Sequence, residues 1–332
     1  MIIVVSYHDD PHAVLVEKAI RESGFSDTVW LDLERVLDEL RLVVAPATWT
    51  LTDRKSGKLV SAHDARTIWW RRTGKLPTPN SHADLSQADF VEAYWATRWL
   101  MESLPDRCFP FGHPRHLRVA ENKLLQLQVA QKVGFKCPDY YIGNDRAQIM
   151  EFCRSQERCV VKPLYLSAVR EGTKDAFTFY TTAIESSTLL ESLAQQEKTA
   201  MLFVETCIQK SRDVRAIVFP DGTYFACEID SSTLPSGEVD WRPTTMTHPH
   251  VECQLPADVL SKGMDYLRTM RLSSGSFDFG ITSDGHWVFF ECNPNGQWLW
   301  MELKTGVPLA RRFASILTDH HQGSLGGSWP TD

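Results

Sequence analysis

Three oxygen-bearing side chains lie in apolar segments near the C-terminal end of the chain. Asp278 stands between two phenylalanines, and Glu291 and Asn293 follow in the run 289–293. Alternate side chains of a strand share a face, so Glu291 and Asn293 point the same way, and a hairpin turn at 283–285 can bring Asp278 opposite them. Carboxylate and amide oxygens suit Mg²⁺. We predict a magnesium site, because unpaired charges in such apolar runs are costly; polar side chains that merely face water are the alternative.

Two lysines are candidates for holding phosphate groups. Lys162 lies near the end of the apolar strand expected at 158–163, where it is poorly placed for simple solvation and well placed to meet a phosphate. Lys123 lies early in the helix expected over 119–133, and by itself it reads as an ordinary surface lysine.

A strand that runs into a polar break can offer backbone groups to a purine. The apolar run 201–204 leads into Glu205 and then into the more polar residues before Ile208. Asp213 and Arg215 follow and share one face of the next strand, so one can bind ribose hydroxyls and the other phosphate oxygens. An exposed ion pair with little effect on stability explains the same spacing equally well.

Arginines could supply the cations that an acidic substrate needs. Arg71 and Arg72 end the apolar strand expected from residue 67, and only one of them should reach a substrate because neighbours on a strand point opposite ways. Arg215 and Arg242 complete the set, and arginine grips a carboxylate with two parallel hydrogen bonds. The alternative is that Arg71 and Arg72 pair with acids of the N-terminal part and serve only folding.

The elements that must position these residues form three successive units. A strand–helix–strand start within 2–31 predicts a parallel sheet, and a hairpin is expected within 48–60. The Gly- and Ser-rich segment 323–332 is expected to be disordered. We therefore predict an N-terminal domain over 1–115, a central lobe over 116–198 and a C-terminal lobe with the metal site over 199–322.

Composition narrows the class of protein. The chain has 332 residues and a formal net charge of −7, which argues against general nucleic-acid binding. No apolar run reaches about 18 residues, so no membrane span is expected. The eight cysteines are irregularly spaced without a CxxC pair, which argues against a disulfide framework or zinc site and favours a reducing cytoplasm. The eleven tryptophans indicate a Trp-rich core or a groove for a peptide.

The same residues occur in an order that resembles the ATP-grasp ligases. The resemblance covers nearly the whole chain, most strongly 118–310, and rests on Asn122-Lys123, Val161-Lys162-Pro163, the Glu205–Ile208 hinge, Asp213-x-Arg215, Asp278 and Glu291-x-Asn293. Further segments look like the graspetide synthetases, which are microviridin-type ATP-grasp enzymes that modify ribosomal peptides. These segments are Thr67-Ile68-Trp69-Trp70-Arg71-Arg72, Glu121-Asn122-Lys123 with Gln126-Leu127, Asp240-Trp241-Arg242 and Asn293-Pro294-Asn295-Gly296-Gln297-Trp298. The hinge departs from these relatives, which more often carry Gln where this chain has Glu205.

The resemblance implies a mixed α/β and α+β architecture, the ATP-grasp fold. An N-terminal domain with a parallel sheet would precede two α+β lobes that hold ATP between them. Lys123 and Lys162 would contact phosphates, Glu205 and Ile208 would line the adenine pocket, and Asp213 would hold the ribose. Asp278, Glu291 and Asn293 would bind Mg²⁺. Arg215 and Arg242 would stabilise charge during catalysis, and Arg71, Arg72 and Asn295 would bind the substrate.

The substrate that the resemblance implies is a precursor peptide with a leader and an acidic core. An Asp or Glu side chain would become an acyl phosphate, and a Thr or Ser hydroxyl or a Lys amine would attack it to close a macrolactone or macrolactam. A homodimer is compatible with the resemblance. Two alternatives stay open: an ATP-grasp ligase that joins an amino acid or amine to a small-molecule or protein carboxylate, and a nucleotide-binding regulatory module without catalysis. The set of Asp278, Glu291 and Asn293 argues against the second.

Overall fold

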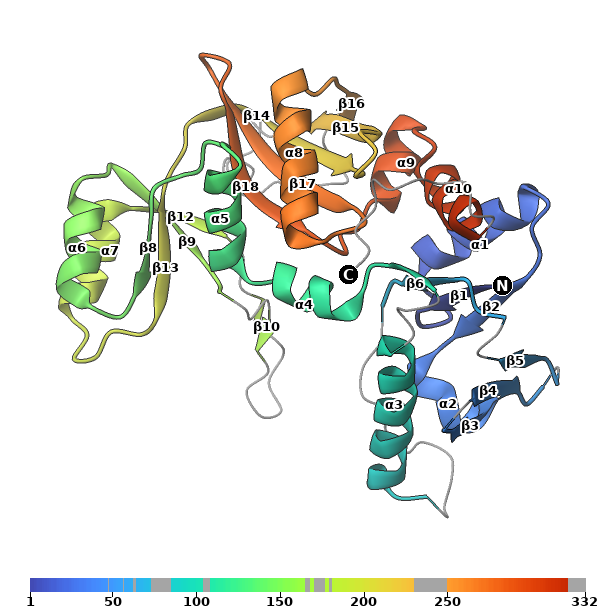
Figure 1. Cartoon of the computed structure of the whole chain (residues 1–332). Helices are drawn as coiled ribbons and strands as arrows, with labels where there is room; N and C mark the ends of the chain where they lie inside the picture. The colour runs from blue at the N-terminus through green and yellow to red at the C-terminus, as the bar shows by residue number, and fades with distance from the viewer. Residues whose placement is uncertain are drawn as a thin grey trace.

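The computed structural model describes residues 1–46, 48–55, 57–61, 64–72, 85–103, 108–164, 168–169, 177–178, 181–229 and 250–321. Figure 1 shows three units in these residues: a parallel sheet near the N-terminus on the right, a five-stranded sheet in the middle and a four-stranded lobe on the left. Within this part of the chain, no helix is long and apolar enough to cross a lipid bilayer. Arg242 and the tail 323–332 lie outside the described residues.

The N-terminal unit is built on a parallel sheet of four strands in the order β2-β1-β6-β7, as the strand–helix–strand start predicts. All residues of β1 and β6 are buried, which is typical of parallel strands covered on both faces. An antiparallel sheet, β3-β4-β5, confirms the expected hairpin. The elements are β1 (Ile2–Val5), α1 (Pro11–Glu22), β2 (Thr28–Leu31), the 3-10 helix η1 (Leu33–Arg35), α2 (Val36–Glu39), β3 (Leu40–Ala45), β4 (Thr48–Asp53), β5 (Leu59–Ser61), β6 (Thr67–Trp70), α3 (Gln87–Glu102) and β7 (Phe109–Phe111).

The central unit is an antiparallel sheet in the order β12-β9-β13-β8, with α6 and α7 packed together beside it. Strand β13 lies inside this sheet, so the unit reaches Thr206 rather than residue 198. The helix expected over 119–133 is divided in two, because the Asn122 side chain accepts from the backbone of Leu125 at 3.1 Å and starts a new helix. The elements are α4 (Pro114–Ala120), α5 (Lys123–Lys132), β8 (Tyr140–Gly143), α6 (Arg146–Arg154), β9 (Arg158–Lys162), β10 (Ala168–Val169), β11 (Phe177–Thr178), β12 (Thr182–Glu185), α7 (Ser186–Ala194) and β13 (Leu202–Thr206).

The C-terminal unit is an antiparallel sheet in the order β16-β15-β14-β17-β18. Helix α8 covers one face of it, where the rings of Tyr266 and Phe277 meet edge to face at 5.4 Å. The other face is left for the charged residues described below. The elements are β14 (Lys210–Val218), β15 (Tyr224–Ile229), β16 (His250–Glu252), α8 (Ala257–Met270), β17 (Gly275–Thr282), β18 (Trp287–Asn293), α9 (Leu299–Thr305) and α10 (Leu309–His321).

The last helix of the described chain returns to the first unit. Helix α10 lies beside α1 and against the parallel sheet (Figure 1). Its Phe313 ring stacks on Trp69 of β6 at 5.9 Å, and the two residues share a buried cluster with Ile2 and Val4 of β1. The N-terminal unit therefore completes its core with residues from the opposite end of the sequence.

Candidate active site

Three charged side chains form a row across the middle of the five-stranded sheet. Arg215 on β14 lies opposite Asp278 on β17, which in turn lies opposite Glu291 on β18. Residues directly opposite share a face of a sheet, so these side chains project together. The Nε atom of Arg215 lies 2.7 Å from Oδ1 of Asp278, and its Nη1 donates to the Ser276 hydroxyl at 2.7 Å. We call Arg215, Asp278 and Glu291 the charged row.

A β-bulge in β18 lets this strand serve the core and the charged row at once. The register shifts just after Asp278, so Glu291 faces Asp278 while Phe289 pairs one residue further along β17, and Phe290 is the extra residue. Phe289 can therefore be fully buried although Glu291, two residues later, faces the site. The Phe290 ring passes over Gly280, where a Cβ atom would lie 2.7 Å from the ring. A larger residue at 280 would displace that ring.

The three side chains predicted to bind a metal lie together. Asp278 and Glu291 pair across the two strands, and Nδ2 of Asn293 lies 3.5 Å from Oε1 of Glu291. Asp278 is buried, Glu291 is half-buried and Asn293 is exposed, so the set opens to one side. No group of three or more His, Cys, Asp or Glu suited to a metal occurs in the residues that the structure describes. Two carboxylates and one amide fit Mg²⁺, which uses few protein ligands and leaves room for phosphate and water.

A buried ion pair lies on the neighbouring strands of the central sheet. Nζ of Lys162 is 2.5 Å from Oε2 of Glu205, and the two side chains are 9% and 2% exposed. Burial raises the pKa of Glu205, and the nearby Lys162 opposes that rise. The second oxygen of this carboxylate, Oε1, is buried without a hydrogen-bond partner among the described residues. Since an unmet buried acceptor is costly, it marks a place where a ligand can donate a hydrogen bond.

Lys123 approaches the same place from α5. Its Nζ donates to the carbonyl oxygen of Pro163 at 2.7 Å, so the two predicted phosphate-binding lysines lie at the end of one strand, β9. Ile208, predicted to line the adenine pocket, is half-buried and follows directly after β13. Because β9 and β13 are antiparallel, Ile208 lies beside the start of β9, Lys123 and Lys162 lie at its end, and Glu205 lies between them.

A second lysine–acid pair lies at the start of β14. Nζ of Lys210 is 2.5 Å from Oδ1 of Asp213, and both side chains are buried. The Phe290 ring lies close to two ammonium groups, because its centroid is 5.6 Å from Nζ of Lys162 and 5.7 Å from Nζ of Lys210. Such contacts are favourable since the face of an aromatic ring is negative. Phe290 therefore joins the central and C-terminal units at the site.

Sequence reasoning missed both Lys210 and Phe290. Phe290 reads as one more core residue in an apolar run, and only the bulge turns it towards the site. Lys210 stands three residues before Asp213, a spacing that could have indicated an ion pair but would not have shown that the pair is buried.

A hollow of about 1040 Å³ opens between the N-terminal unit and the end of β18. It reaches from Asn293 to the carboxyl ends of β1 and β6, the edge of a parallel sheet where ligands commonly bind. Its volume slightly exceeds the roughly 300–1000 Å³ of small-molecule pockets. Acidic and basic side chains both line the hollow. Its lining consists of Tyr7, His8, Asp9, Asp32, Glu34, Arg35, Trp70, Arg71, Arg72, Arg98, Pro114, Leu117, Arg118, Glu121, Asn293, Pro294 and Asn295.

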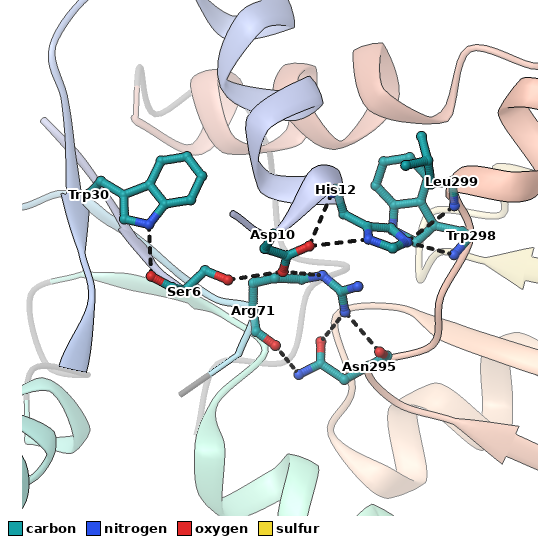
Figure 2. Close-up of polar contacts among 8 residues, drawn as sticks. All are labelled: Ser6, Asp10, His12, Trp30, Arg71, Asn295, Trp298 and Leu299. Carbon is teal, nitrogen blue, oxygen red and sulfur yellow. Dashed lines mark hydrogen bonds and ion pairs between the residues drawn. The ribbon is translucent and has the colours of Figure 1, made fainter. Parts of the chain in front are cut away.

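The two arginines predicted to bind the substrate differ in their surroundings. Arg71 is 2% exposed, its Nε lies 3.4 Å from Oδ2 of Asp10, and its Nη1 donates to the backbone oxygen of Asn295 at 2.8 Å (Figure 2). The Asn295 side-chain amide donates in return to the carbonyl of Arg71. Arg72 is half-buried, and both arginines line the hollow. Arg71 pairs with an acid of the N-terminal unit, which is the folding role given above as the alternative.

Comparison with known proteins identifies the fold. No protein-family model matches the chain, and no curated protein matches it. A solved structure of a RiPP-associated ATP-grasp ligase from Chryseobacterium gregarium, in complex with ADP and a leader and core peptide, is similar over 100% of this chain and 99% of its own. The TM-score is 0.85, at 20% sequence identity. The chain has the ATP-grasp fold.

Two further structures with this fold are similar over 96% of the chain. The macrocyclase MdnC from Microcystis aeruginosa MRC, bound with the precursor peptide MdnA, has a TM-score of 0.77 and 21% identity, with 99% of its own chain covered. The ATP-grasp ligase PsnB, complexed with a phosphomimetic variant of a minimal precursor, Mg and ADP, has a TM-score of 0.71 and 18% identity, with 98% of its own chain covered. The predicted ATP-grasp architecture is therefore confirmed, with the charged row and the two lysine–acid pairs on its central and C-terminal lobes.

Proposed function

We propose that this chain is an ATP-dependent ligase that closes rings between side chains of a ribosomal precursor peptide. The fold supports this, because similar structures hold ADP, a leader and core peptide, or a precursor peptide. The observation that carries the proposal is the course of β18. The strand runs from Phe290, which lies against Lys162, through the charged row to Asn293 at the edge of the hollow. One strand thus connects a cationic site suited to a nucleotide with a cavity large enough for a peptide segment.

The proposed nucleotide contacts follow from charge and from the unmet acceptor. The buried Oε1 of Glu205 can accept a hydrogen bond from the exocyclic amine of adenine, with Ile208 against the ring. Lys123 and Lys162 are the cations for the phosphates, since both ammonium groups lie at the end of β9. Asp213, held by Lys210, is the acceptor proposed for the ribose hydroxyls.

The proposed metal ligands are Asp278, Glu291 and Asn293. When bound, Mg²⁺ neutralises phosphate charge and aligns the γ-phosphate for transfer. The protein prepares this end of the site through Arg215, whose contacts with Asp278 and Ser276 fix the direction of the Asp278 carboxylate. Asp278 is buried and Glu291 is half-buried, so the Glu291 carboxylate is the more accessible of the two to a cation.

The proposed reaction has two steps. A carboxylate oxygen of a core Asp or Glu attacks the γ-phosphorus of ATP, the bond to the β,γ-bridging oxygen breaks, and ADP leaves. A hydroxyl or amine of the same peptide then attacks the acyl carbon, loses its proton, and displaces phosphate to leave an ester or amide. Arg72 in the hollow is proposed to hold the entering carboxylate, which lowers the entropic cost of bringing the reactants together. Arg215, together with Arg242 outside the described residues, is proposed to stabilise the developing negative charge.

Mass spectrometry tests this function. The chain is incubated with MgATP and with acidic precursor peptides that also contain Thr or Lys, and both peptide mass and ADP are measured. We expect each ring to lower the peptide mass by one water and to release one ADP. The Glu291→Gln variant should leave the peptide mass unchanged and release no ADP. ADP release that depends on a small amine and leaves the peptide intact would favour the small-molecule ligase instead. No nucleotide turnover with any acceptor would favour a regulatory module.

A further inference from the structure

The run Asn293-Pro294-Asn295-Gly296-Gln297-Trp298 connects the proposed metal ligands to α9, and the N-terminal unit holds this run at both ends. Near its start, Nη1 of Arg71 donates to the backbone and side-chain oxygens of Asn295, at 2.8 and 3.4 Å. At its end, Nε2 of His12 accepts the backbone N–H groups of Trp298 and Leu299, each at 3.2 Å. Figure 2 shows both attachments, which reach the run from β6 and α1.

Asp10 organises both attachments. Its Oδ2 lies 3.4 Å from Nε of Arg71, and its Oδ1 lies 3.2 Å from Nδ1 of His12. When Nδ1 carries the proton and donates to Asp10, Nε2 keeps a lone pair for the two backbone donors. Asp10, His12 and Arg71 are 1%, 6% and 2% exposed. We call these three residues the interdomain clamp.

The opposite side of the same run packs on Ser276, a hydrogen-bond partner of the charged row. A Cβ atom at Gly296 would lie 2.4 Å from Cβ of Ser276, so the backbone there packs directly on the Ser276 side chain. The Ser276 hydroxyl accepts from Arg215, whose Nε faces Asp278. A shift of the run would therefore displace Ser276 on one side and Asn293, two residues before Asn295, on the other.

We propose that the interdomain clamp positions the magnesium end of the active site, and that Arg71 and Asn295 are positioning residues rather than substrate ligands. The inference rests on the proposed function, because it takes Asn293 as a metal ligand. A contact that only fastened two units together would not need buried charge, since apolar packing of similar volume is often as stable. The clamp instead directs hydrogen bonds to both ends of one short run, and removal of such partners behind metal ligands typically weakens metal binding about 10- to 100-fold.

Calorimetry of a non-hydrolysable ATP analogue tests the proposal. Binding is measured over a series of Mg²⁺ concentrations and again in EDTA, and thermal unfolding is followed in parallel. The variants are Asn295→Ala and Arg71→Lys, which keeps the charge beside Asp10 but loses the Nη1 contacts with Asn295. His12→Gln retains a far acceptor for the α9 backbone, and His12→Leu removes it. The matched control is Ser273→Ala, which removes other interdomain hydrogen bonds, one from the backbone of Gly112 at 3.3 Å and one to the carbonyl oxygen of Pro110 at 3.5 Å.

Asn295→Ala, Arg71→Lys and His12→Leu should each raise the Mg²⁺ concentration at half-saturation about ten-fold or more. His12→Gln should recover most of the loss, and Ser273→Ala should bind like the wild type. Analogue binding in EDTA should stay unchanged in all of them. Unaltered Mg²⁺ dependence in Asn295→Ala, or an equal shift in Ser273→Ala, would overturn the positioning role while leaving the proposed function intact. A wild-type chain that binds no nucleotide at any Mg²⁺ concentration would overturn both.

Discussion

Replacing Asp278 by Asn tests whether charge holds the row together. The side chains of Arg215 and Asp278 are 5% and 8% exposed, and their closest polar atoms are 2.7 Å apart. Asn has nearly the same size and shape as Asp, so the change removes a charge without opening a cavity. Loss of one partner from a buried pair leaves the other charge uncompensated, which costs about 3–5 kcal/mol. We expect Asp278→Asn to lose about 3 kcal/mol, since the Ser276 hydroxyl still accepts from Arg215.

Thermal unfolding measures this loss. At roughly 2–4 °C per kcal/mol for a unit of this size, about 3 kcal/mol lowers the melting temperature by roughly 6–12 °C. The matched control is Asp258→Asn, which breaks an exposed pair with Lys262 on α8, where Asp258 is 67% exposed and the atoms are 3.0 Å apart. That variant should melt within about 2 °C of the wild type, because exposed ion pairs contribute little. If Asp278→Asn melts as the control does, Arg215 is compensated elsewhere and the electrostatic account of the row is wrong.

Three further predictions concern metal, phosphate and pH. Glu291→Gln and Asn293→Ala should abolish turnover at limiting Mg²⁺ with little change in melting temperature, because both side chains are more exposed than Asp278; near-normal turnover would remove them from the metal site. Lys162→Ala and Lys123→Ala should weaken ATP binding in calorimetry, and unchanged affinity would make that lysine a structural residue. Burial lowers the pKa of His12 below 6.5, so the unfolded chain binds this proton more readily than the folded one. The stability that depends on neutral His12 should therefore be fully present above about pH 6.5 and be lost as the pH drops below it. His12→Gln should flatten part of the fall in melting temperature with pH, and an unchanged pH dependence would exclude His12 as a source.

Local pattern was enough to predict that the two acidic strands pair through the turn at 283–285. It did not give the exact register, because a regular hairpin would put Phe290 opposite Asp278, and the bulge brings Glu291 there instead. The strand–helix–strand start within 2–31 likewise predicts the parallel sheet, because parallel neighbours need a crossover connection such as a helix. These features depend on residues close together in the sequence, or on a single periodicity.

Contacts between distant segments could not be predicted in this way. Gln126 donates to the carbonyl of Ala120 at 2.7 Å and accepts the backbone N–H of Cys292 at 3.1 Å, which ties α5 to the strand of the metal ligands across 166 residues. No spacing rule relates such positions. The same holds for Arg71 and Asn295, which lie 224 residues apart in the sequence. Spacing alone therefore suggested a substrate-binding arginine where the structure has a buried contact between two units. The lobe boundary at 198 separates β13 from its sheet for a similar reason, because the pairing of β13 with β8 and β9 cannot be seen from spacing.

The return of α10 to the N-terminal sheet has a consequence for synthesis of the chain on the ribosome. Ile2, Val4 and Trp69 are buried in a cluster that includes Phe313, which emerges roughly 240 residues after Trp69. During that interval the nascent N-terminal unit exposes an apolar face, and such faces bind chaperones or aggregate. Lowering the growth temperature weakens apolar association and should raise the yield of soluble full-length chain. A fragment that ends before α10 should be recovered mainly as aggregate.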